Sequence, residues 1–169
     1  DRAARVATTG AGATTGEYTA AAWEHRLATG FGDAGTVGVA GITLAGGIGF
    51  LVRKHGMTID SLLAAEVVTA GGEILRVDAE RHPDLFWALR GGGGNFGVVT
   101  KLDLRLHELP EFYGGMLLLP ATPEGVAGVV AAADGAPEEL SVIANVMPAP
   151  PMPFVPEERH GELIVMATL

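Results

Sequence analysis

The chain has 169 residues, 48% of them hydrophobic, and it contains no cysteine. This hydrophobic content excludes a disordered chain, and the lack of cysteine excludes disulfides, thiolate metal ligands, a cysteine nucleophile and a cysteinyl link to a cofactor. The net charge of −9 argues against nucleic-acid binding, and no segment reaches the roughly 18 uninterrupted apolar residues of a membrane span.

Elements with clear hydrophobic periodicity alternate with glycine-rich segments up to Pro110. Alternating apolar and polar residues are typical of half-buried strands, and apolar residues three and four apart are typical of helices. In chain order these patterns predict a strand at 2–8, a helix at 17–27 without a capping box, a short helix at 41–48, a hairpin of strands at 62–70 and 74–77, a helix at 85–89 and a strand at 96–106.

The pattern changes after Pro110. The predicted elements there are a strand at 116–119, a helix at 123–133, and strands at 140–147 and 163–168. We therefore expect an α+β protein in which residues 1–110 form one domain and residues 111–169 begin a second, incomplete domain.

The two ends of the chain carry none of the usual signals of a complete protein. The sequence opens at Asp1 without an initiator methionine or a signal peptide, and it closes at Leu169 after an apolar run. We expect the chain to be a fragment of a longer protein.

Two glycine-rich stretches carry the argument about chemistry. The first covers residues 36–49, and the second, at 89–100, contains four consecutive glycines before a good strand. Glycine lets a ligand approach the backbone closely, so both stretches indicate ligand contact. Two other interpretations stay open: the first stretch could serve tight helix packing, and the second could be a flexible loop.

Neither stretch matches a common nucleotide-binding motif. A glycine-rich loop at 10–16 resembles the dinucleotide fingerprint, but its last glycine comes one place too late and no acidic residue ends a second strand about 20 residues on. No glycine loop is followed by Gly-Lys-Ser/Thr, so the chain has no P-loop.

Three strings are more specific: VGVAGITLAGGIGFLVRKHG at 37–56, EVVTAGG at 66–72 and DLFWALRGGGGNFGVVT at 84–100. They resemble the berberine-bridge-enzyme-like branch of the vanillyl-alcohol-oxidase flavoproteins, which have a PCMH-type FAD-binding domain. The resemblance is strong over 2–109 and looser over 148–161. It implies the second α/β subdomain of that FAD-binding domain, followed by the start of an α/β substrate domain.

The resemblance also implies which residues contact FAD. Residues up to Gly38 would approach the pyrophosphate and flavin, and those from Gly41 would line the flavin ring and ribityl chain. Residues from Gly46 would lie near the ribose and adenine, and those from Gly97 would pack against adenine. The implied FAD-binding residues are Gly35, Thr36, Val37, Gly38, Gly41, Thr43, Leu44, Gly46, Gly47, Ile48, Gly97, Val98 and Val99.

Two departures from the family pattern bear on the flavin linkage. Many members have a cysteine that bonds flavin where this chain has Ala34, and some plant members have a histidine where it has Ile42. The resemblance therefore implies FAD held non-covalently, or mono-covalently through a histidine that lies outside this chain.

No residue of the chain is predicted to be catalytic, because the family's catalytic base comes from a later part of the substrate domain. We expect Tyr18, Phe86 and Trp87 to be core residues and His55 to lie in a solvated surface turn. The other histidines are too widely spaced to predict a metal site.

The resemblance implies an FAD-dependent oxidase that transfers hydride from an alcohol, sugar, amine or natural product to flavin and then to O2. The fragment alone is expected to be inactive, and its implied partners are a small-molecule substrate, O2, and a complementing chain or the remainder of the protein. We expect a cytoplasmic location. Two alternatives stay open: a non-catalytic remnant or association module that no longer binds FAD, and a generic nucleotide-binding module.

Overall fold

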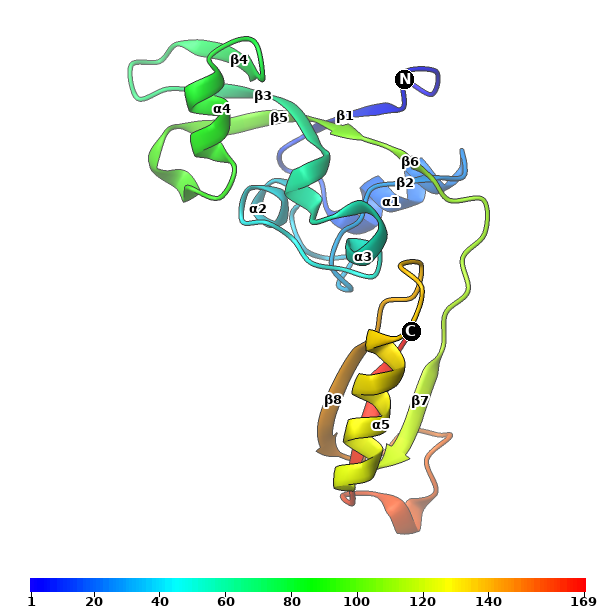
Figure 1. Ribbon diagram of the computed structural model, residues 1–169. Helices are drawn as coiled ribbons and strands as arrows, with labels where there is room; N and C mark the ends of the chain where they lie inside the picture. Colours follow the sequence, from blue (N-terminus) through cyan, green and yellow to red (C-terminus); the bar gives the residue numbers. More distant parts are fainter. The chain divides into compact units, whose positions relative to one another are not determined.

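The computed structural model describes all residues from 1 to 169 and divides into two compact units, Asp1–Glu111 and Phe112–Leu169 (Figure 1). The division falls one residue after the boundary that the sequence predicts. No helix is both long and apolar enough to cross a lipid bilayer.

Unit 1 is built on one antiparallel sheet. Its strands, in spatial order, are β1 (Val6–Gly10), β5 (Val98–Arg105), β3 (Leu62–Val68) and β4 (Ile74–Asp78). The first strand pairs with a strand more than ninety residues later, with Ala7 opposite Leu104. The hairpin β3–β4 adds the outer strand with Ala65 opposite Val77.

Helices and short segments connect these strands. They are α1 (Thr15–Trp23), α2 (Val39–Leu44), α3 (Val52–His55), α4 (Pro83–Leu89), the 3₁₀ turns η1 (Thr58–Ser61) and η2 (Gly93–Asn95), and the small strand pair β2 (Leu27–Ala28) with β6 (His107–Glu108).

The first helix begins with a capping box, which the sequence reasoning missed. The Thr14 side chain accepts from the backbone N–H of Glu17, and the Glu17 carboxylate accepts from the N–H of Thr14. The box begins at Thr14, three residues before the predicted start of the helix. The helix also ends earlier than predicted, because Arg26 adopts a left-handed conformation with φ of 55° and redirects the chain into β2.

The core of unit 1 lies on one face of the sheet. The buried side chains include Tyr18, Val39, Val67, Val77, Phe86, Leu89, Leu102 and Leu104. The core roles expected of Tyr18 and Phe86 agree with this placement, but Trp87 is 78% exposed. Phe86 and Leu89 are three residues apart and share the inner face of α4, so Trp87 points away from the sheet.

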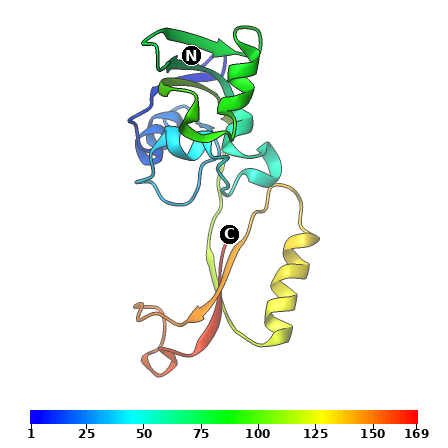
Figure 2. The same cartoon turned by 90° about the vertical axis from the view of Figure 1, so that its left-hand side faces the viewer.

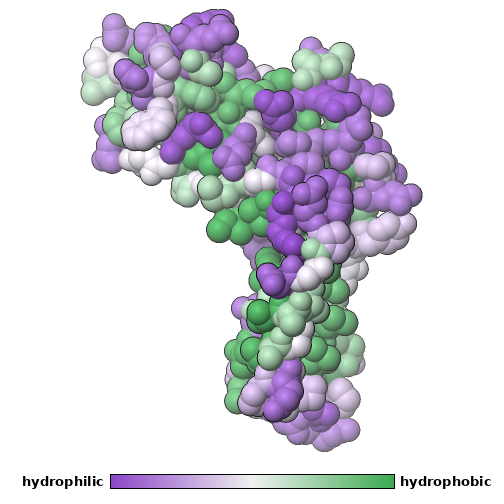
Figure 3. Space-filling view, in the orientation of Figure 1, coloured by the Kyte–Doolittle hydropathy of each residue, from purple (hydrophilic) through white to green (hydrophobic).

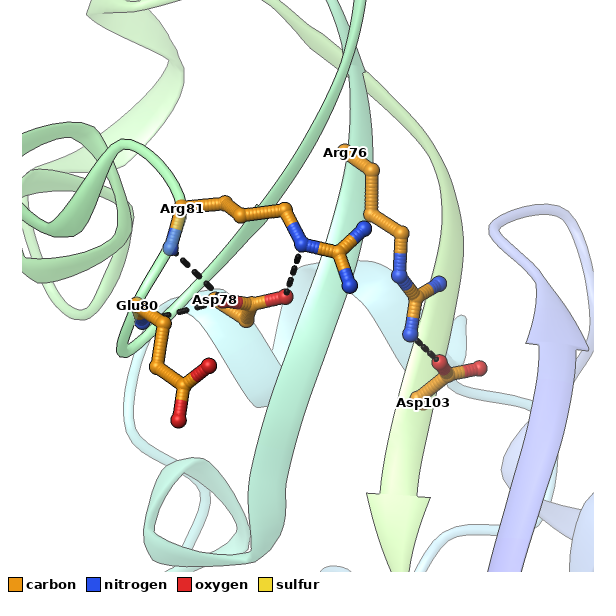
Figure 4. A network of polar contacts seen from close by, with 5 residues as sticks. All are labelled: Arg76, Asp78, Glu80, Arg81 and Asp103. Atoms are coloured by element: carbon orange, nitrogen blue, oxygen red, sulfur yellow. Dashed lines mark hydrogen bonds and ion pairs between the residues drawn. The ribbon is translucent and has the colours of Figure 1, made fainter.

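The other face of the sheet carries a polar network (Figure 4). The Asp103 carboxylate accepts hydrogen bonds from the Arg76 guanidinium and, at 2.6 Å, from the Thr8 hydroxyl, which joins three strands. The hydrogen bond from Arg76 and its charge satisfy a carboxylate that is almost fully buried. Backbone N–H groups of Arg81 and Glu80 donate to Asp78 and lower the pKa of that carboxyl.

Unit 2 is a three-stranded antiparallel sheet with one helix. The sheet order is β7 (Met116–Pro120), β9 (Leu163–Thr168) and β8 (Ile143–Pro148), with a 3₁₀ turn η3 (Glu157–Arg159) before β9. The helix α5 (Pro123–Asp134) is capped by the Thr122 hydroxyl and runs beside the strands (Figure 2).

The small core of unit 2 leaves much apolar surface uncovered. Ala149, Val155 and Ile164 are buried, whereas Leu117, Val130 and Leu163 are exposed. The apolar colouring over this unit in Figure 3 shows the same feature. An apolar groove of about 420 Å³ lies between α5 and the sheet.

His55 differs from its sequence expectation of a solvated turn. It ends α3, and its ring stacks on that of His107 in β6, with centroids 4.0 Å apart and planes 14° apart. The Nε2 atom of His107 lies 3.2 Å from the Ser61 hydroxyl. Burial lowers the pKa of His107 to about 4, and the neighbouring charges of His55 and Arg105 act in the same direction.

Acidification is therefore expected to destabilise unit 1. His107 has a folded-state pKa of about 4 against an ordinary value of 6.5, so the unfolded chain binds more protons between these values. The stability contribution is complete above pH 6.5 and is lost as the pH falls toward 4. In thermal unfolding measured across this range, His107→Gln should flatten the pH dependence and the control His25→Gln, at an exposed histidine, should not. Equal slopes in the wild type and His107→Gln would contradict the assignment.

Candidate cofactor-binding site

The first group of predicted residues forms an extended arm along the start of α1. The N–H of Thr15 donates to the carbonyl of Val37 at 2.8 Å, and the N–H of Val39 donates to that of Ala13 at 2.9 Å. The N–H of Gly16 donates to the carbonyl of Gly35 at 2.8 Å. These bonds fix the backbone of Gly35, Thr36, Val37 and Gly38, all of which are exposed.

The second group lies on α2, directly after this arm. Val39 and Thr43 are fully buried and anchor the helix to the core, while Gly41 faces outward. The Thr43 hydroxyl is buried without a hydrogen-bond partner, and Leu44 packs partly against the core. The structure therefore leaves the backbone near Gly41, rather than the Thr43 side chain, accessible from outside.

The glycines of these groups are of two kinds. A Cβ at Gly38 or Gly41 would meet nothing within 4 Å, so no contact within the chain requires glycine there. Glycine inside a helix costs about 1 kcal/mol relative to alanine, and α2 bears this cost at Gly41 without any gain in packing.

Other predicted glycines are explained by packing. A Cβ at Gly47, whose φ is +76°, would lie 2.2 Å from the Thr58 hydroxyl oxygen. A Cβ at Gly97, whose φ is +146°, would lie 2.6 Å from the Val68 carbonyl oxygen. The packing interpretation left open for the first stretch therefore holds for Gly47, and Gly97 in the second stretch is likewise explained by a close contact. Gly46 also has a positive φ of 113°.

The remaining predicted residues differ in exposure. Ile48 is 70% exposed and Val98 is 68% exposed. Val99 lies partly buried against the core. Ile48 and Val98 therefore offer apolar surface to a ligand, and Val99 supports the strand from inside.

The glycine quartet lies next to α2. The N–H of Gly91 donates to the carbonyl of Leu44 at 3.1 Å, and the side chains of Arg90 and Asp60 form an ion pair at 3.5 Å. The two glycine-rich stretches are thus neighbours within unit 1. Gly94 lies in the second stretch but is not among the implied FAD-binding residues, although a Cβ there would also meet nothing within 4 Å. The run of four consecutive glycines is the sequence signal that could have added Gly94 to the predicted site residues.

Tyr18 is not available as a catalytic phenol. Its hydroxyl lies 2.9 Å from that of Thr29, which in turn donates to the carbonyl of Arg105 at 2.7 Å. Burial raises the pKa of Tyr18 to about 12, so the phenol stays protonated. The side chain serves the core, where it packs edge-on against Phe31.

These features fit a large, flat cofactor better than a metal ion or a small anion. Gly35 and Gly38 of the exposed arm, Gly41 and Gly94 present main chain without side chains, and Ile48 and Val98 add apolar surface. A cofactor that combines an aromatic ring system with a long polar chain needs such close backbone approach together with apolar contact.

Comparisons with known proteins agree with this geometry. Residues 1–78 match the family described as FAD binding domain. The (R)-6-hydroxynicotine oxidase of Paenarthrobacter nicotinovorans is 37% identical over 131 residues, which make up 77% of this chain and 29% of that protein. The crystal structure of 6-hydroxy-D-nicotine oxidase from Arthrobacter nicotinovorans matches with a TM-score of 0.80 at 32% identity, over 99% of this chain and 37% of that one. BBE-like #28 from Arabidopsis thaliana gives 0.79 at 29% identity, over 99% and 34%.

The fold and the family match define part of an FAD-binding domain. More specifically, the chain belongs to the berberine-bridge-enzyme-like flavoproteins with a PCMH-type FAD-binding domain. The predicted family and the α+β fold class are thereby confirmed. The chain spans about a third of the length of the relatives that it matches.

The two kinds of glycine predict opposite effects on stability. Gly41→Ala should leave the free energy of unfolding unchanged or raise it by up to about 1 kcal/mol, because it improves helix propensity in open space. Gly47→Ala should lower it by at least about 2 kcal/mol, because the new Cβ meets Thr58 and φ is positive. Denaturant unfolding measures both. Similar losses for both variants would mean that α2 is packed more tightly than the structure shows.

Proposed function

We propose that the complete protein containing this chain is an FAD-dependent oxidoreductase that oxidises a small organic molecule by hydride transfer, with O2 as the final acceptor. The observation that carries this proposal is the bare backbone at Gly38 and Gly41, for which no contact within the chain gives a reason. Bound FAD would supply the hydride acceptor.

In this proposal the residues of unit 1 bind and orient the cofactor. The arm at Gly35–Gly38 lies fixed by its hydrogen bonds to the start of α1, so little ordering is needed when FAD binds. Gly41 leaves room for the flavin ring and ribityl chain to lie against α2. Val98 and Ile48 would exclude water from the apolar parts of the cofactor.

The proposed substrate is a small amine or a carbohydrate alcohol. Relatives named for their activity support both classes: (R)-6-hydroxynicotine oxidase is similar in sequence, and a glucooligosaccharide oxidase of Acremonium strictum matches in structure with a TM-score of 0.78 at 31% identity. The two substrate classes have to be compared in assays of the complete protein. A panel of nicotine-like amines and oligosaccharides, followed by flavin bleaching without O2, would separate them.

The flavin linkage in this proposal is non-covalent, or a single bond to a histidine outside residues 1–169. Ala34 has no thiol to bond flavin, and the chain has no cysteine elsewhere. Acid precipitation of the complete protein distinguishes the two linkages, because only a covalent flavin stays in the pellet.

The proposal predicts that Gly41→Ala weakens FAD binding. The added methyl group would occupy the space proposed for the cofactor. Displacing the cofactor by about 1 Å in a fitted site is expected to lower its affinity at least tenfold. Titration of the apoprotein with FAD, followed by flavin fluorescence, measures this effect.

Gly128→Ala is the matched control for this titration. Gly128 also lies inside a helix with open space around its Cβ, but it belongs to α5 in unit 2. Gly128→Ala should leave FAD affinity unchanged. A wild-type protein that is colourless and takes up no FAD would favour the non-catalytic alternative. Equal FAD affinities of Gly41→Ala and wild type would show that Gly41 does not contact the cofactor.

A further inference from the structure

The exposed turn that carries the glycine quartet is fixed to the rest of unit 1 at its first residues. The N–H of Gly91 donates to the carbonyl of Leu44, the last residue of α2. Next to it, the guanidinium of Arg90 lies 3.5 Å from the carboxylate of Asp60 in η1. One hydrogen bond thus connects the turn to the first glycine-rich stretch, and one ion pair connects it to η1, which follows that stretch.

The other hydrogen bonds of the turn run to α4 or stay within the turn, and the N–H of Gly92 donates to the carbonyl of Ala88 at 3.0 Å. Residues 91–96 are all exposed, and the bond from the Asn95 side-chain amide to the carbonyl of Gly92, at 3.0 Å, is internal to the turn. Four glycines in a row lose more conformational entropy on ordering than any other residues would. Of these contacts, those at Gly91 and Arg90 link the turn to α2 and η1.

Both members of the ion pair are held in place by other contacts. The Asp60 carboxylate accepts from the N–H of Met57 at 2.9 Å, which fixes it at the start of η1. The Arg90 guanidinium lies over the ring of Phe86, 5.7 Å from its centroid, and Phe86 is buried in the core. Because each side chain is already oriented, the pair loses less entropy on forming than two free surface side chains do.

We propose that Arg90 and Asp60 are positioning residues for the cofactor site: their ion pair sets the distance between the glycine quartet and α2, and thereby tunes FAD affinity. Neither residue needs to touch the cofactor. This inference rests on the proposed function, since it concerns the same two stretches. It adds two residues that affect the site through the position of the turn, without contacting the cofactor.

The expected size of the effect follows from the exposure of the pair. Their side chains are 36% and 47% exposed, so salt screens the pair and its contribution is modest. Loss of the pair should weaken FAD binding roughly two- to fivefold at low salt. The difference should become smaller as the salt concentration rises beyond the physiological range.

The test is a double-mutant cycle in the complete protein, with Arg90→Gln, Asp60→Asn and the double variant. Asparagine at position 60 keeps an oxygen that can accept from Met57, so the local turn is preserved. FAD dissociation constants at low and high salt are the readout, and melting temperatures are measured alongside. Arg81→Gln is the control, because Arg81 forms a comparable ion pair at 3.6 Å with Asp78, away from α2.

The proposal expects each single variant to weaken FAD binding at low salt, the double variant to add little further loss, and Arg81→Gln to match wild type. The melting temperatures of Arg90→Gln and Arg81→Gln should be similar. Equal FAD affinities for wild type and Arg90→Gln, or additive losses in the double variant, would overturn the positioning role. A wild-type protein that takes up no FAD would instead overturn the proposed function.

Discussion

The pairing of β3 with β5 is the constraint on which the rest of unit 1 depends. These central strands bury Val67, Leu102 and Leu104 completely on one face, and that face accepts α1, α2 and α4. Burial of each such side chain contributes about 1.5–3 kcal/mol, so the helices stay on this side of the sheet. Because β5 begins at Val98, shortly after the glycine quartet, the same pairing that builds the core also brings that turn beside α2.

This arrangement separates two uses of glycine that look identical in sequence. Gly47 and Gly97 are needed because the chain contacts itself at these points, and a side chain would collide with Thr58 or with the backbone of Val68. Gly38 and Gly41 have no such contact. Alanine would stabilise α2 at Gly41 and equally α5 at Gly128, so open space alone does not mark a ligand site. The case for Gly41 rests on its place between the exposed arm and the neighbouring glycine quartet.

Much of the fold was predictable from the sequence, because the alternation in β5 and the turn after β3 are local patterns that tertiary contacts reinforce. The exposure of Trp87 was not predictable, since α4 is too short for its inner face to be read from apolar residues alone. The stacking of His55 on His107 joins residues far apart in sequence, and no local sequence pattern predicts it. For the site, sequence reasoning found the glycine-rich stretches but could not say which glycines serve packing, because that depends on neighbours such as Thr58.

The central claim is that the exposed main chain around Gly38, Gly41 and Gly94 contacts FAD. Hydrogen–deuterium exchange of the complete protein, with and without FAD, tests it at the level of individual segments. The account predicts that amides at 35–42 and 91–98 become protected when FAD is present, while those of α5 exchange at the same rate in both states. FAD binding that leaves the exchange of both glycine-rich segments unchanged would contradict it.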